Sequence, residues 1–130
     1  MSDIGDIPTP AAPAAERSAV VSKAVSRAAA RLGLTNAALA RTIGVSEATA
    51  SRLRGGIYAL DPSTKPYELA LLLIRLFRSL DAVVGGDEAS LHSWMVTTNH
   101  ALRGVPCDLV QTTTGLVAAV DYVDAARARI

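Results

Sequence analysis

Apolar side chains recur along this chain at the three- and four-residue spacing that gathers them on one face of an α-helix. Residues 16–32 carry one such stripe, which consists of Val21, Ala24, Val25, Ala28 and Leu32. Gly33 follows directly and is suited to a left-handed helix end, a conformation that a Cβ disfavours. No segment shows the strict alternation of a half-buried strand. The pattern therefore predicts an all-α fold.

Two short helices are predicted to follow, over residues 36–43 and 47–54. Thr35 and Ser46 directly precede them and are suited to cap them, because a hydroxyl oxygen accepts a free backbone N–H of the first turn. Gly44 lies between the two helices, where a tight turn favours a residue that adopts positive φ readily.

A longer helix is predicted over residues 66–84, with Pro66 in its first turn. Its apolar residues cover an arc of about 200° when successive residues are placed ~100° apart, and only Asp81 interrupts this arc. A surface helix needs a stripe about half as wide. We therefore expect this helix to be central in the fold or to pack against another chain as well. Since an exposed arc of this width is unusual on a monomer, a homodimer through Leu76 and its neighbours is predicted.

Shorter helices are expected in the last third of the chain. Asp87 is placed to cap a helix whose apolar side chains are Leu91, Trp94 and Met95. Short segments are expected over residues 99–103 and 106–111. Thr114 is expected to cap the last helix, whose apolar stripe consists of Leu116, Ala119, Val120, Val123, Ala126 and Ile130.

The chain is expected to divide into a tail and two helical regions. Residues 1–14 contain three prolines and no apolar stripe, which predicts a flexible tail. Residues 15–60 hold the first three helices, and residues 61–130 hold the long helix and those after it. Residues 16–54 carry seven basic and two acidic side chains, whereas residues 81–124 carry one basic and six acidic ones. The net charge of +1 therefore hides a basic and an acidic half, which suggests two different tasks.

Composition narrows the chemistry that this chain can perform. Hydrophobic residues make up 50% of its 130 residues but aromatic residues only 4%, so Ala, Leu, Val and Ile must form the core. The single cysteine, Cys107, excludes an internal disulfide and a cysteine-rich zinc site. His92 and His100 lack partners at metal-ligand spacing. No nucleophile–base pair indicates an enzyme, so neither catalytic residues nor a cofactor are predicted.

The compartment is inferred from features that the sequence lacks. Its beginning has no basic start followed by a long apolar run, as a secretory signal does. Arg75 and Arg78 interrupt the longest apolar run before it reaches the length of a membrane span. We therefore expect a cytoplasmic protein with no membrane partner.

Residues 36–53 resemble the helix-turn-helix of the Xre class, which is similar to phage repressors. The residues that carry the resemblance are Ala40 where the helices cross, Gly44, Val45, Ser46 and Leu53. The resemblance implies that residues 15–60 bind operator DNA and that the second helix of the motif enters the major groove. Because one such motif binds DNA weakly, it also implies a dimer. The alternative is a helical hairpin with a glycine turn and no role on DNA.

The resemblance also identifies the side chains that would face DNA. They are Ser46, Glu47, Thr49, Ser51, Arg52 and Arg54. The two arginines can reach guanine or phosphate. Glu47 repels phosphates but is suited to accept a hydrogen bond from cytosine.

A second resemblance covers the acidic half of the chain. Residues 94–109 follow the pattern W-M-x-x-x-N-x-A-L-x-G-x-P-x-D-L, and Gly115 and Val120 come after it. This pattern resembles the toxin-binding domain of Xre/MbcA/ParS antitoxins. Together with the helix-turn-helix, the resemblance runs from about residue 20 to the end of the sequence. It implies a helical dimerisation and toxin-binding domain over residues 61–130.

The family resemblance implies a bacterial antitoxin of a type II toxin–antitoxin system. Its partner would be a RES-type toxin that consumes NAD, and it would block the active site of the toxin and repress the shared promoter. The side chains expected to contact the toxin are Trp94, Asn99, Leu102, Arg103, Arg127, Arg129 and Ile130. We expect the last three to insert into the substrate pocket of the toxin or to cover it, since arginine can bind a carboxylate there through two hydrogen bonds.

A different function is compatible with the same residues. The chain would then be a stand-alone helix-turn-helix repressor whose C-terminal half only dimerises. Trp94 would be a core anchor, Asn99 a turn former, and Arg127 and Arg129 would only stabilise the negative end of the helix dipole. A neighbouring gene for an NAD-consuming toxin would favour the antitoxin.

Overall fold

The computed structural model describes residue 7 and residues 9–130, and these residues form helices and connecting turns without a strand. The all-α prediction is therefore confirmed for this part of the chain. The flexible tail expected over residues 1–14 falls largely on residues 1–6 and 8, which lie outside the described residues. Ala14, the last residue of that expected tail, already begins the first helix.

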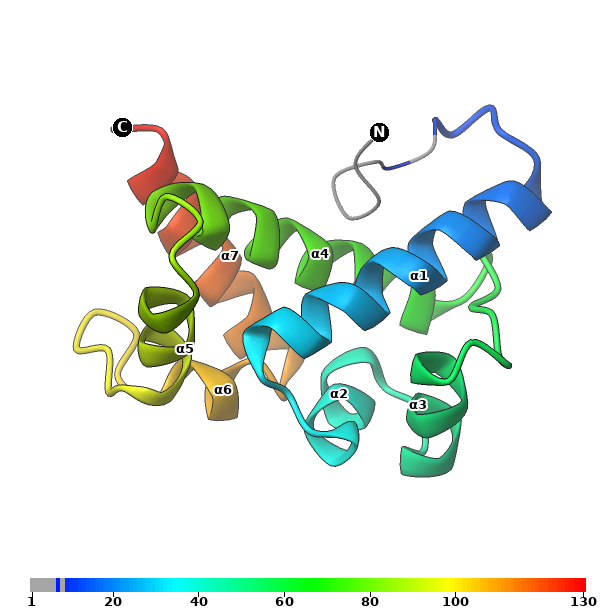
Figure 1. The fold of residues 1–130 in the computed structure, drawn as a ribbon, viewed down its shortest axis with the longest axis horizontal. Helices are drawn as coiled ribbons and strands as arrows, with labels where there is room; N and C mark the ends of the chain where they lie inside the picture. The colour runs from blue at the N-terminus through cyan, green and yellow to red at the C-terminus, as the bar shows by residue number, and fades with distance from the viewer. Residues whose placement is uncertain (1–6, 8) are drawn as a thin grey trace.

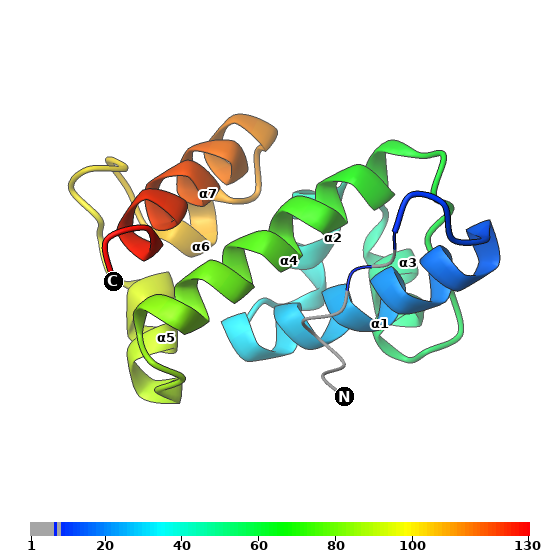
Figure 2. The same cartoon turned by 90° about the horizontal axis from the view of Figure 1, so that it is seen from above.

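The described residues form seven α-helices in the order α1 (Ala14–Leu32), α2 (Asn36–Ile43), α3 (Glu47–Arg54), α4 (Lys65–Val83), α5 (Glu88–Val96), α6 (Pro106–Leu109) and α7 (Thr113–Arg127). Figure 1 shows α3 toward one end of the long axis of the molecule and α5 with α6 toward the other, while α1 runs from the first end past the middle and contacts α5. The long helices α1, α4 and α7 lie side by side, with α4 in the middle (Figure 2).

Helix α4 is the centre of the hydrophobic core. It packs against α1 and α2 on one side and against α7 on the other (Figure 2). Leu73, Ile74 and Leu76 are fully buried within the single chain. The wide apolar arc is thus explained by a central position, as one of the two alternatives predicted. Since Leu76 is already covered by its own chain, the width of the arc no longer requires a second copy.

The helix-turn-helix has the capping interactions that the sequence predicts. The Thr35 hydroxyl oxygen accepts a hydrogen bond from the backbone N–H of Ala38 at 3.0 Å, which caps α2. The Ser46 hydroxyl caps α3 in the same way, by accepting the N–H of Thr49 at 3.0 Å. Gly44 turns the chain between the two helices with φ 77°. These local interactions fix α3 against α2.

The short segment at residues 99–103 is a turn, in which Asn99 and Gly104 exchange backbone hydrogen bonds of 2.8 and 3.2 Å. One expectation for the C-terminal third is wrong. The last helix is capped by Thr112, not Thr114, since the Thr112 hydroxyl oxygen accepts the N–H of Gly115 at 3.1 Å.

The end of the last helix also differs from the prediction. Helix α7 ends at Arg127, so Ile130 does not extend the apolar stripe, and its side chain is 78% exposed. The short helix α6 likewise ends at Leu109, two residues before the expected position. The buried stripe of α7 consists of Leu116, Ala119, Val120 and Val123.

Candidate functional site

The outer face of α3 carries a chain of hydrogen bonds between three of the residues predicted to face DNA. Oγ1 of Thr49 accepts hydrogen bonds from the Ser46 hydroxyl at 2.9 Å and from Nη2 of Arg52 at 3.1 Å. Ser46 and Arg52 are exposed, and Thr49 is half-buried. These bonds hold the Arg52 guanidinium against the surface of α3, so less side-chain freedom is lost when it binds a partner.

The remaining residues predicted to face DNA divide into two groups. Glu47 and Ser51 are exposed on α3. Arg54 is half-buried, and its Nη1 donates a hydrogen bond of 2.7 Å to the backbone oxygen of Leu34. Arg54 therefore ties the end of α3 to the turn between α1 and α2. Ala50, on the inner face of α3, is fully buried.

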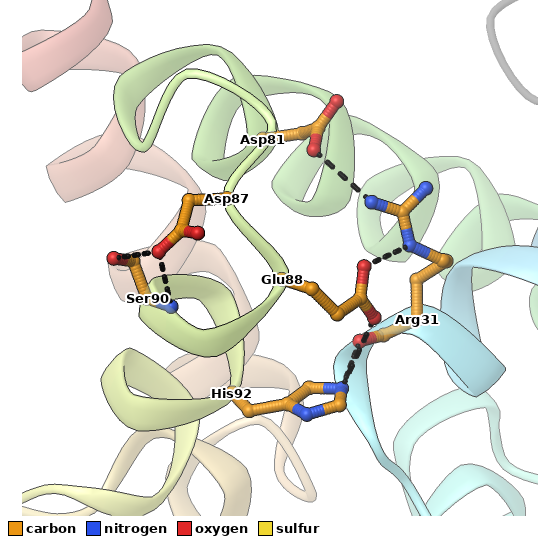
Figure 3. A network of polar contacts seen from close by, with 6 residues as sticks. All are labelled: Arg31, Asp81, Asp87, Glu88, Ser90 and His92. Carbon is orange, nitrogen blue, oxygen red and sulfur yellow. Dashed lines mark hydrogen bonds and ion pairs between the residues drawn. The ribbon is translucent and has the colours of Figure 1, made fainter.

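A polar network joins the helix-turn-helix to the C-terminal helices (Figure 3). Nε of Arg31, at the end of α1, lies 2.9 Å from Oε1 of Glu88, and its Nη2 lies 3.4 Å from Oδ1 of Asp81. The same guanidinium lies over the ring of Phe77, 5.1 Å from its centroid. Nε2 of His92 lies 2.9 Å from the backbone oxygen of Arg31. One arginine thus contacts α4 and α5 together.

The network in Figure 3 also includes the cap of α5. Oδ2 of Asp87 accepts hydrogen bonds from the N–H and the hydroxyl of Ser90, which confirms the predicted cap. These hydrogen bonds hold the pKa of Asp87 below its usual value. Since the side chains of Arg31 and Glu88 are 37% and 52% exposed, each ion pair contributes only about 0–1 kcal/mol. The network therefore orients α5 more than it stabilises the fold.

The candidate toxin-contact residues of α5 and the following turn lie close together. Trp94 is half-buried against the core and borders a hollow together with Asn99. The Asn99 side chain accepts the backbone N–H of Leu102 at 3.0 Å, so Asn99 forms the turn as well as facing the hollow. Leu102 packs partly against the core. Arg103 is exposed in this turn with φ 64°.

A tight corner between α6 and α7 supports this turn. A Cβ at Gly115 would lie 1.9 Å from the backbone oxygen of Leu109, which is closer than any side chain can approach. A Cβ at Gly104 would lie 3.0 Å from the Leu109 side chain. Glycine is therefore required at position 115, where α6 meets α7, whereas a Cβ at position 104 would make only a tight contact with a side chain.

The end of α7 holds the other candidate toxin-contact residues. Nη1 of Arg127 lies 3.4 Å from the Ser79 hydroxyl oxygen on α4, so this side chain leans back against the core helix. Arg129 and Ile130 lie beyond the helix end and are exposed. The charge of Arg127 also acts on Asp124, whose pKa it helps to lower.

Asp124 is the centre of the contacts between α4 and α7. Its Oδ2 lies 2.6 Å from Nη2 of Arg75, and its Oδ1 accepts the Ser79 hydroxyl at 2.7 Å. Although burial raises the pKa of Asp124, the hydrogen bonds from Ser79 and Arg75 and the charges of Arg75 and Arg127 lower it overall. Asp124 is therefore ionised at neutral pH.

The described part of the chain gives little support for a reactive cysteine, a metal site or a membrane-spanning helix. Burial and the neighbouring Asp108 raise the pKa of the Cys107 thiol, so the nucleophilic thiolate is disfavoured. Within residues 7 and 9–130, no three His, Cys, Asp or Glu side chains gather as metal ligands would. None of the helices of this part is long and apolar enough to cross a bilayer.

Comparisons with known families match both ends of the molecule. Residues 11–75, half of the chain, match the model of the antitoxin Xre-like helix-turn-helix domain. Residues 79–129 match the model of the antitoxin Xre/MbcA/ParS C-terminal toxin-binding domain. Among curated proteins, none matches the sequence significantly. The first match contains α1 to α3, and the second contains α5 to α7 with the corner at Gly115.

Proposed function

Because the chain belongs to the Xre/MbcA/ParS antitoxin family, we propose that it neutralises a RES-type toxin that consumes NAD and represses the promoter it shares with that toxin. It is an antitoxin that combines a DNA-binding domain with a toxin-binding domain. The type of toxin, its reaction and the contact residues are the proposed part.

The observation that carries the proposal is the separation of two candidate surfaces on one molecule. The exposed face of α3 and the end formed by α5 and the turn at Asn99 lie at opposite ends of the long axis (Figure 1). A bound toxin at one end therefore leaves the other end accessible to DNA. This arrangement suits a protein that inhibits its partner and represses transcription at the same time.

We expect the α3 face to read operator DNA through Arg52 and Thr49. Replacing both by alanine should raise the Kd for promoter DNA by tenfold or more, because a lost base contact costs about 1–3 kcal/mol. Fluorescence anisotropy with labelled promoter DNA measures this effect. The affinity of the parent chain should also fall steeply with salt, since phosphate contacts release counterions.

Lys65→Ala is the matched control for this experiment. Lys65 is an exposed basic residue outside α3, at the start of α4, and its ion pair with Glu68 is exposed too. Its removal should leave promoter affinity nearly unchanged. Equal affinity of the parent chain and the Arg52/Thr49 double variant would contradict the assignment of the DNA-binding surface to α3.

We further propose that two copies bind the operator together. One helix-turn-helix reads a single half-site, and a dimer gains affinity by reading two half-sites about one helical turn apart. Since Leu76 is buried within the chain, such a dimer uses a surface other than the inner face of α4.

For the toxin, we propose contacts through Trp94, Asn99, Leu102 and Arg103 and through the chain end, where Arg127, Arg129 and Ile130 lie. An exposed arginine beyond α7 is suited to bind the polar groups that handle the ribose of NAD. Trp94 supplies apolar area next to the hollow that Asn99 borders. The exposed side chains of Ile130 and Arg129 are the part of the molecule best able to enter a pocket.

Deletion of residues 128–130 should restore NAD consumption by the toxin in the complex. These residues follow the last residue of α7, so their removal leaves the buried stripe of the helix intact. Circular dichroism and light scattering verify helicity and assembly, and an NAD-consumption assay measures inhibition. Full inhibition by the truncated chain at unchanged toxin affinity would move the inhibitory surface to residues 94–109.

The same assay tests the alternative of a stand-alone repressor. A repressor whose C-terminal half only dimerises would bind promoter DNA but would not bind the toxin encoded by the neighbouring gene. The match of residues 79–129 to a toxin-binding domain favours the antitoxin over this alternative.

A further inference from the structure

A groove runs between α4 and α7 on a face that none of the predicted contacts on α5 uses. It has a volume of about 670 Å³. Leu71 is half-buried and supplies apolar surface, whereas Ile74, which also lines the groove, is fully buried. Arg75, Arg78 and Arg127 supply positive charge, and Asp124 supplies one negative charge. Ile7, which is 39% exposed, borders the groove and extends its apolar part.

The groove carries more positive than negative charge. Asp124 is neutralised by Arg75 at 2.6 Å. Arg127 lies against Ser79 and contributes to the lowered pKa of Asp124. Arg78 is exposed and forms no ion pair or hydrogen bond with any residue that the structure describes. Three arginines against one aspartate leave a surplus of positive charge, whereas residues 81–124 carry an excess of acidic side chains.

We propose that this groove binds an acidic segment of the toxin, with a carboxylate on Arg78 and an apolar side chain on Leu71. The inference rests on the proposed neutralisation of a toxin and names a contact surface for it. Arg78 can bind a carboxylate through two parallel hydrogen bonds, and arginine is enriched in the buried parts of protein interfaces.

Three features favour a protein segment over a nucleic acid as the occupant. The groove combines positive charge with an apolar wall, which a phosphate backbone does not need. Its residues Leu71 and Arg78 are about 10 Å apart along α4, a span that about three extended residues cover. The groove also reaches Arg127 and Ala128, so it is continuous with the chain end proposed to enter the toxin.

Charge reversal at Arg78 tests the proposal. We expect Arg78→Glu in the full-length chain to raise the Kd for the purified toxin encoded by the neighbouring gene by at least tenfold, measured by isothermal titration calorimetry. Arg78 is exposed, so the fold should remain intact, as circular dichroism verifies. Lys65→Glu is the matched control, because it makes the same change of charge on the same helix at an exposed site outside the groove. It should leave the Kd unchanged.

The possible results distinguish a failure of the groove as a contact surface from a failure of the proposed neutralisation of the toxin. Normal toxin binding by both the parent chain and Arg78→Glu would overturn the groove as a contact surface and leave neutralisation intact. Equal weakening by Arg78→Glu and Lys65→Glu would also overturn it, since long-range charge would explain the loss. Absence of toxin binding by the parent chain would overturn neutralisation itself. A toxin variant in which an acidic residue is replaced by arginine should bind Arg78→Glu again. Such a recovery would establish that this toxin residue pairs with Arg78.

Discussion

Leu76→Glu is expected to unfold the protein instead of releasing monomers from a dimer. Leu76 is fully buried in α4, the helix that packs against α1, α2 and α7. A carboxylate at this position would be buried without a partner, and an apolar side chain would be lost from the core. Together these effects should lower the free energy of unfolding by about 4–5 kcal/mol, a large part of the stability of a small domain. Urea denaturation followed by circular dichroism measures the loss.

Leu72→Glu is the control for this prediction. Leu72 lies on the same helix but is only partly buried, so its carboxylate can reach water. Its substitution should cost much less than that of Leu76. A Leu76→Glu variant that remains helical and becomes monomeric would contradict the central position of α4 and support a dimer through this helix.

Gly115→Ala should disrupt the corner between α6 and α7 at a cost of about 2–4 kcal/mol. The added Cβ would lie 1.9 Å from the backbone oxygen of Leu109, so one of the two helices must move. Because the corner supports the turn at Asn99, toxin binding should be lost more readily than DNA binding. Thermal unfolding measures the loss of stability, and separate titrations with toxin and promoter DNA compare the two activities.

Gly55→Ala provides the matched glycine control. Gly55 caps α3 with φ −79°, and its nearest neighbour to an added Cβ is a backbone oxygen at 3.4 Å. Alanine adopts this conformation without strain and restricts the unfolded chain, so stability should change little or increase slightly. A Gly115→Ala variant as stable as Gly55→Ala would show that the α6–α7 corner relaxes easily.

Local signals in the sequence predicted the helix-turn-helix well. Thr35, Gly44 and Ser46 act within three or four residues of their own positions, so their roles follow from the order of residues alone. The exposed face of α3 could be predicted for the same reason, because helical spacing fixes which side chains share a face. The DNA contact of Arg54 stays a prediction, but its hydrogen bond to the backbone oxygen of Leu34, 20 residues away, does not follow from local spacing.

The junction between the two halves could not be predicted from local patterns. Arg31 and Glu88 are separated by 57 residues, and only the folded chain brings them together. The start of α7 was ambiguous for a different reason. Three consecutive threonines, Thr112, Thr113 and Thr114, can each cap a helix, and the selection of Thr112 coincides with the close approach of Gly115 to Leu109. Tertiary packing therefore decides between positions with the same intrinsic preference.

Helix α4 belongs partly to the DNA-binding domain and partly to the toxin-binding domain, and this limits how domains of this antitoxin can be exchanged with those of its relatives. The family match to the helix-turn-helix ends at residue 75 and the match to the toxin-binding domain begins at residue 79, so the boundary falls inside one continuous helix. In a chimaera joined within α4, parts of this helix from one parent would have to pack against α1 or α7 from the other parent. Under the proposed DNA contact through α3, operator specificity would be exchanged between relatives at the exposed side chains of that helix, where Glu47, Ser51 and Arg52 can change without altering the core.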